Sequence, residues 1–194
     1  GQRCTATSRL VLHRKIHDRF VARVAEAAEK LRLGDGRRPG TDVGPLIHED
    51  ARDKVERYVQ VGLDQGAELV TGGARPRGAR TAKGWFYKPT IFANVRAGSR
   101  LEQEEIFGPV LSVVRVGSFE EALNVNNGVK YGLSSSLYTR DVNLAFRALE
   151  ELGERKLDVG GEVRREERPQ IAHAPRSAVA SNASTRAAWR RGVA

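Results

Sequence analysis

The sequence predicts an α/β domain followed by a tail of different character, and one feature supports each part of this prediction. From Ser8 to about Leu152, short apolar runs typical of buried strands alternate with longer stretches whose apolar residues recur at helical spacing. Beyond Gly153 the alternation stops, and the few large apolar residues follow no period. We therefore expect a folded domain over residues 1–153 and an atypical, poorly ordered tail over residues 154–194.

The first half of this domain is expected to hold two strands and two helices. The apolar run at residues 9–13 predicts a buried strand, and helical spacing covers residues 16–33 and 49–65. Glycines at positions 34 and 36 end the first of these helices. Residues 68–71 predict a second strand, which Gly72 and Gly73 end in a turn.

The second half begins with a surface loop over residues 71–84 that is rich in Gly, Arg and Ala. β-Branched and aromatic residues predict strands at residues 86–95, 110–116 and 133–139. A capping box that starts at Ser118 predicts a helix over residues 118–126. Asp141 is expected to cap a last helix that ends near Leu152.

Charge raises the question of nucleic-acid binding, since 33 Lys and Arg stand against 24 Asp and Glu and give a net charge of +9. The basic residues are scattered or interleaved with acids, as in residues 164–168, and no aromatic stripe accompanies them. This pattern is typical of a solvated surface, so we expect no nucleic-acid partner. A basic nucleic-acid binder remains as an alternative that only the net charge favours.

Membrane insertion and secretion are not expected. No apolar run approaches the roughly 20 residues that a membrane-spanning helix needs, and the N-terminus shows no charged-then-apolar leader. One cysteine cannot form an internal disulfide, so a cytoplasmic location is the expectation. The chain has no methionine and begins with Gly1, which leads us to expect a piece of a longer product.

Cys4, the single cysteine, lies directly before the first predicted strand with Arg3 beside it. A neighbouring positive charge or a set of backbone N–H groups favours the thiolate that acts as a nucleophile. A lone cysteine is more often an inert buried side chain, so both interpretations stay open at this point.

A second candidate group lies at residues 102–110, where Glu104 and Glu105 precede Phe107 and a Gly-Pro turn that leads into a strand. A carboxylate at a strand entrance can accept hydrogen bonds from ribose hydroxyls, as acidic residues do in dinucleotide sites. On its own, the pattern also fits a solvated helix end before a turn.

The four histidines do not predict a metal site. Only His13 and His17 lie four residues apart, and no acid or cysteine stands near them at metal-ligand spacing; the others are His48 and His173. We expect surface or core histidines and no bound metal.

Five motifs in order resemble those of the aldehyde dehydrogenase superfamily. They are Gly-Gln-Arg-Cys-Thr-Ala at residues 1–6, Asp-Val-Gly-Pro-Leu-Ile at 42–47, Gly-Trp-Phe-Tyr-Lys-Pro-Thr-Ile-Phe at 84–92, Glu-Glu-Ile-Phe-Gly-Pro-Val at 104–110, and Asn-Asn at 126–127 followed by Tyr-Gly-Leu-Ser-Ser-Ser-Leu-Tyr-Thr-Arg-Asp at 131–141. The finer resemblance is to bacterial semialdehyde dehydrogenases.

The resemblance implies an α/β catalytic domain with an open, mostly parallel sheet flanked by helices. It also implies NAD(P)-dependent oxidation of a small aldehyde or semialdehyde to a carboxylic acid, by a full-length protein that is a homo-oligomer. Cys4 matches the nucleophile, which forms a thiohemiacetal and then a thioester, and its backbone N–H would hold part of the oxyanion. Glu105 matches the carboxylate that binds the nicotinamide ribose, and Phe107 matches the aromatic residue beside the nicotinamide.

Departures from the family pattern concern both ends of the chain. The family's general-base glutamate, oxyanion asparagine and dinucleotide-binding region lie upstream of the nucleophile and are not in this sequence. The Gly-x-Val-x-Val-Asn strand and the Pro-Phe-Gly-Gly turn expected after residue 152 are also missing, and the sequence there is typical of an out-of-frame reading of GC-rich codons. We therefore expect a frameshifted tail. We expect the isolated chain to be inactive, although it carries the nucleophile of an active enzyme. The alternative is an inactive fragment, or a binding or assembly remnant of the fold, that takes no part in any reaction.

Overall fold

The computed structural model describes residues 1–152, and the tail expected over residues 154–194 lies outside them. The elements are, in order, β1 (Arg9–His13), α1 (Arg14–Glu29), α2 (Glu49–Asp64), β2 (Glu68–Thr71), the 3₁₀ turn η1 (Ala79–Thr81), β3 (Thr90–Ala93), α3 (Arg100–Gln103), β4 (Val110–Val116), α4 (Phe119–Asn127) and α5 (Val142–Glu151). Within this part of the chain, no helix is both long enough and apolar enough to cross a bilayer.

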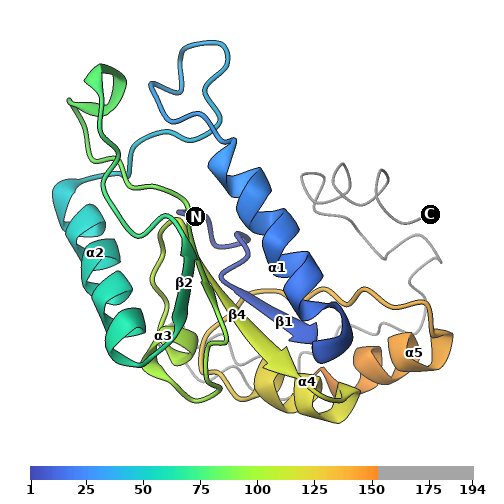
Figure 1. Cartoon of the computed structure of the whole chain (residues 1–194). Helices are drawn as coiled ribbons and strands as arrows, with labels where there is room; N and C mark the ends of the chain where they lie inside the picture. Colours follow the sequence, from blue (N-terminus) through green and yellow to red (C-terminus); the bar gives the residue numbers. More distant parts are fainter. Residues whose placement is uncertain (153–194) are drawn as a thin grey trace, which may run out of the picture. The chain divides into compact units, whose positions relative to one another are not determined.

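The four strands form one open sheet in the order β1-β4-β3-β2 (Figure 1). β4 pairs in parallel with β1 on one side and with β3 on the other, and β2 joins β3 antiparallel at the edge. The expected open, mostly parallel sheet is therefore confirmed, and its two central strands are almost entirely buried.

Helices cover both faces of the sheet because successive strand residues point to opposite sides. Phe92 of β3 and Val114 of β4 pack in one apolar cluster with Val55 of α2. Ile91 and Val113, their neighbours in the same strands, pack in a second cluster that includes residues of α1. Helices α1 and α2 thus lie on opposite faces, which leaves the ends of the strands for loops (Figure 1).

Two strand predictions need correction. The strand expected at residues 86–95 extends only over Thr90–Ala93, because Pro89 has no N–H to offer a ladder and Lys88 bonds instead to the carbonyl of Ala74. The strand expected at residues 133–139 does not form in the described part of the chain. Leu133 and Tyr138 are exposed there, and none of the four strands of the described sheet pairs with this segment.

The helix predictions hold with shifted ends. α1 begins at Arg14, where the side chain of His13 accepts a hydrogen bond from the N–H of Lys15. It ends at Glu29 instead of residue 33, because Leu33 bridges to Val43 as part of the following loop. Asp141 and Ser118 cap α5 and α4 as expected.

Candidate functional site

The loops that carry the two candidate motifs lie at the same end of the sheet, the end at which β1 and β4 begin. β1 and β4 are parallel neighbours, with Arg9 opposite Ser112, so the segments before these strands arrive at the same end of the sheet (Figure 1). Cys4 and Phe107 each stand five residues before this pair. Strand topology therefore brings the expected nucleophile and the expected nicotinamide-side aromatic to one region, although about a hundred residues separate them.

Direct packing joins the two loops. Gly1 lies so close to Gly108 that a Cβ atom on Gly1 would overlap the carbonyl oxygen of Gly108. On its other side Gly108 faces α2, where an added Cβ atom would overlap Cγ2 of the fully buried Val55. Gly1 can therefore approach the backbone of Gly108, and Gly108 can approach the side chain of Val55, because neither glycine has a side chain.

Cys4 lies in a tight turn with its side chain exposed. The N–H of Ala6 donates to the carbonyl of Arg3 at 2.9 Å, which closes the turn around Cys4. Oε1 of Gln2 accepts a hydrogen bond from the N–H of Ile47 at 2.9 Å, which ties the turn to the segment before α2. The exposure argues against the inert buried cysteine and leaves the thiol accessible to a small molecule.

Glu105 and Phe107 lie in the turn before β4, and both side chains are exposed. Nζ of Lys54 donates to the backbone carbonyl of Glu105 at 2.7 Å. Phe107 has a φ of 55°, a left-handed conformation that costs a bulky residue about 1 kcal/mol or more. This conformation holds the Phe107 ring partly in solvent, with 41% of the residue exposed.

Glu104 fixes the start of the same turn. Its carboxylate accepts a hydrogen bond from the hydroxyl of Tyr58 at 2.6 Å and from Nε of Arg100 at 2.9 Å. The hydrogen bond from Arg100, followed by that from Tyr58, lowers the pKa of Glu104 from 4.5 to about 2. The two adjacent glutamates therefore have different environments. The carboxylate of Glu104 is hydrogen-bonded to side chains of α2 and α3, whereas Glu105 is exposed to solvent.

Tyr131 lies beside the start of β1. Burial raises the pKa of its phenol, while a hydrogen bond with Ser8 and the charge of Arg9 act in the opposite direction. The guanidinium of Arg9 lies 5.9 Å from the centre of the Tyr131 ring. The Tyr-Gly-Leu motif therefore begins at the end of the sheet where β1 starts, a few residues after Cys4.

The histidines of residues 1–152 have other partners. His48 caps α2, His13 contacts the carbonyl of Gly117, and His17 is buried beside Asp18. Within these residues, no three His, Cys, Asp or Glu side chains gather closely enough to hold a metal ion. His173 lies outside the described residues.

Sequence reasoning singled out Cys4, Glu105 and Phe107 but missed the residues that hold them. Lys54 and Glu105 are 51 residues apart, and Gln2 and Ile47 are 45 apart. Each bond joins a side chain to a backbone group, so neither hydropathy nor motif spacing signals it.

Comparison with known proteins identifies relatives along the described part of the chain. A family model described as "Aldehyde dehydrogenase family" matches residues 1–168. The betaine aldehyde dehydrogenase of Bacillus subtilis is 42% identical over 152 residues, which are 78% of this chain and 31% of that protein. The chain thus spans about a third of the length of the curated relatives that it matches.

Solved structures with the same fold are similar over the same share of the chain. A putative aldehyde dehydrogenase from Burkholderia cenocepacia is 41% identical with a TM-score of 0.76, and the match covers 78% of this chain and 31% of that one. The 1-pyrroline-5-carboxylate dehydrogenase from Thermus, solved with bound NAD, is 39% identical with a TM-score of 0.73, over 78% and 28% of the two chains.

Proposed function

Because the chain belongs to the aldehyde dehydrogenase family, we propose that it provides the nucleophile and the nicotinamide-side carboxylate for NAD(P)-dependent oxidation of a small aldehyde or semialdehyde to a carboxylic acid. The observation that carries this proposal is the packing of Gly1 on Gly108. It joins the turn of Cys4 to the turn of Glu105 and Phe107, as a reaction between a bound aldehyde and a neighbouring nicotinamide requires.

Cys4 is the nucleophile in this proposal. Its thiolate sulfur adds to the aldehyde carbon, and the carbonyl electron pair moves to oxygen to give a thiohemiacetal oxyanion. The backbone N–H of Cys4 donates to that oxyanion, because the closed turn between Arg3 and Ala6 fixes the backbone. Water then hydrolyses the thioester formed from this adduct, which releases the carboxylic acid and returns the thiolate.

The exposed groups of the Glu105 turn fit a nicotinamide nucleotide. The carboxylate of Glu105 can accept hydrogen bonds from two ribose hydroxyls. The partly exposed ring of Phe107 offers a flat apolar surface against which a second ring can pack. In this proposal Glu105 binds the ribose and Phe107 flanks the nicotinamide. The chemistry that NAD(P)+ supplies when bound is acceptance of the hydride that leaves the carbon attached to Cys4, which turns the adduct into the thioester.

The remaining parts of the reaction are assigned to protein outside these 194 residues. The family resemblance implies an upstream general base, a second oxyanion donor and a site for the adenosine and pyrophosphate of the cofactor. We therefore propose that the chain alone does not oxidise aldehydes. Purified and folded, it should give no sustained NAD(P)H formation with short aldehydes and semialdehydes.

The test of the nucleophile uses the complete product of the gene that encodes this chain. Cys4→Ala and Cys4→Ser should each abolish aldehyde-dependent NAD(P)H formation, and Gln60→Met, an exposed change on α2, serves as the control. A Cys4→Ala rate within about threefold of the parent is incompatible with covalent catalysis at this position. A folded parent that is itself inactive towards the whole aldehyde panel favours the alternative, a remnant of the fold without chemistry.

A further inference from the structure

We infer that Gln2 is a positioning residue that holds the turn of Cys4 against the start of α2. This inference rests on the proposed function, because the reason to fix Cys4 is its role as nucleophile. The contact is the hydrogen bond at 2.9 Å from the N–H of Ile47 to Oε1 of Gln2, which stands two residues before Cys4.

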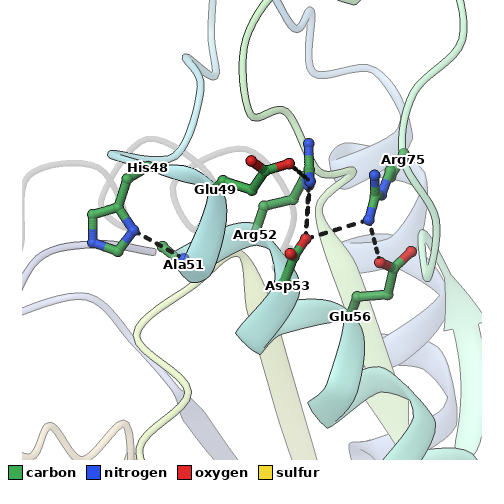
Figure 2. Close-up of polar contacts among 7 residues, drawn as sticks. All are labelled: His48, Glu49, Ala51, Arg52, Asp53, Glu56 and Arg75. Carbon is green, nitrogen blue, oxygen red and sulfur yellow. Dashed lines mark hydrogen bonds and ion pairs between the residues drawn. The ribbon is translucent and has the colours of Figure 1, made fainter.

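Ile47 is a firm anchor because the start of α2 is well braced. His48, the next residue, caps the helix, and its Nδ1 accepts from the N–H of Ala51 at 3.1 Å (Figure 2). Glu49 and Asp50 in the first turn suit the positive end of the helix dipole. A side chain bonded to Ile47 is thus bonded to the fixed end of a helix.

Ion pairs extend this bracing beyond the helix cap. Arg52 bonds to Glu49 at 2.6 Å and to Asp53 at 2.9 Å (Figure 2). Arg75, which lies after β2, reaches Glu56 at 2.6 Å and Asp53 at 3.3 Å, so it ties the following loop to the same helix face.

One contact just before α2 and one on α2 then set the relative position of the two halves of the site. Gln2 attaches the Cys4 turn to Ile47, which precedes the cap residue of α2, and Lys54 of α2 holds the carbonyl of Glu105. Gly1, the neighbour of Gln2, rests on Gly108 of the Glu105 turn. Since a displacement of about 1 Å between reacting groups can lower a rate about a hundredfold, loss of one attachment should affect catalysis more than folding.

The attachment is measured first in the 194-residue chain. Gln2→Met removes the acceptor, Gln2→Glu keeps an acceptor oxygen at the same reach, and Gln60→Met makes the first change at an exposed position of α2. We expect Gln2→Met to speed hydrogen exchange of the Ile47 amide by about fivefold or more, and Gln2→Glu and Gln60→Met to leave it near the parent.

The single cysteine allows a second measurement without further engineering. A nitroxide attached to Cys4 should become about twofold more mobile in Gln2→Met and stay as in the parent in Gln60→Met. Gln2→Glu should restore the mobility of the parent. Parental exchange at Ile47 together with parental label mobility in Gln2→Met overturns the inference.

The complete gene product shows whether this attachment matters for the reaction. Gln2→Met should lower kcat about tenfold while KM for NAD(P)+ stays within about twofold, and Gln2→Glu should recover most of kcat. An unchanged kcat overturns the positioning role, whatever Cys4→Ala does. If the parent has no activity at all, the proposed function fails, and the exchange and label results alone decide whether Gln2 holds the turn.

Discussion

The carbonyl oxygen of Gly108 fills the space that a side chain on Gly1 would need, so the Cys4 turn and the Glu105 turn pack directly on each other. The two motifs are about a hundred residues apart, so no local sequence pattern brings them together. The parallel pairing of β1 with β4 brings them to one end of the sheet, and the missing side chain of Gly1 allows the final approach.

Gly108→Ala should destabilise the fold. The new Cβ atom would overlap Cγ2 of Val55, a fully buried residue of α2 with a stiff β-branched side chain, and overpacking of this kind costs about 1–3 kcal/mol. Urea denaturation of the 194-residue chain measures the change. Gly36→Ala is the matched control, since no atom lies within 4 Å of its added Cβ atom and its φ needs no glycine. Equal stability of the two variants contradicts the packing described at Gly108.

Arg9→Met should be more damaging than any surface ion-pair change. Arg9 pairs with Glu102, and the two side chains are only 8% and 1% exposed. The same guanidinium donates to the carbonyl of Val125 at 3.1 Å, so it also holds the end of α4. Removing one partner of a buried pair costs about 3–5 kcal/mol, because the carboxylate of Glu102 stays buried without an opposite charge, although Gly98 and Gln103 still donate hydrogen bonds to it.

The control for this prediction is Lys30→Met. Lys30 pairs with Glu26 at the C-terminal end of α1, where the side chains are 71% and 66% exposed, and solvent screens such pairs so that they contribute little to stability. Thermal and urea unfolding of both variants should separate them clearly. A loss for Arg9→Met as small as that for Lys30→Met shows that the Arg9 pair is solvated in solution.

Lys54→Met should weaken use of the cofactor, in contrast to the loss of kcat expected for Gln2→Met. Without the ammonium, the carbonyl of Glu105 loses its bond at 2.7 Å and the carboxylate of Glu105 is less well placed for the ribose. We expect KM for NAD(P)+ in the complete gene product to rise between about 3-fold and 10-fold, the effect of one partly exposed charged hydrogen bond. Lys54→Arg, which keeps a donor, should stay near the parent, and Lys30→Met should have no effect. A cofactor KM unchanged by Lys54→Met removes the role assigned to this contact.

The elements that sequence predicted well are those whose residues decide their own structure. β4 is an apolar, β-branched run between a Gly-Pro turn and Gly117, and it forms with the expected bounds at Val110–Val116. The segment at residues 133–139 holds three serines and only one β-branched residue, Thr139, and none of the four strands of the described sheet pairs with it. Helix α3 has four residues, about one helical turn, so it leaves no period to detect.

The site divides in the same way. Cys4, Glu105 and Phe107 are recognisable because each lies in a contiguous motif, and a motif is a local pattern. The positions of Gln2 and Lys54 matter only through backbone groups of distant residues, Ile47 and Glu105. Such contacts depend on how α2 packs across the sheet, so they emerge only when the fold is known.

The hydrogen bonds to Glu104 should make the stability of the fold depend on pH in the acid range. Its carboxylate is held by Arg100 first and Tyr58 second, which lowers its pKa from 4.5 to about 2. A carboxyl group with a lowered pKa in the folded state stabilises the fold fully above its unfolded pKa, and this contribution is lost as pH falls through the folded value. The free energy of unfolding of the parent should therefore fall between about pH 4.5 and pH 2. The Glu104→Gln variant has no carboxyl group at this position, so its free energy of unfolding should fall less in this window. Urea midpoints measured at steps of half a pH unit should converge for the two proteins in this window and differ by a constant amount above about pH 5.5.

Arg100→Met removes the larger cause of the pKa shift while Glu104 itself is retained. In this variant the urea midpoint should depend less on pH between about pH 4.5 and pH 2 than in the parent. Parallel curves for all three proteins down to pH 2 would show that these bonds do not hold the Glu104 carboxylate in solution.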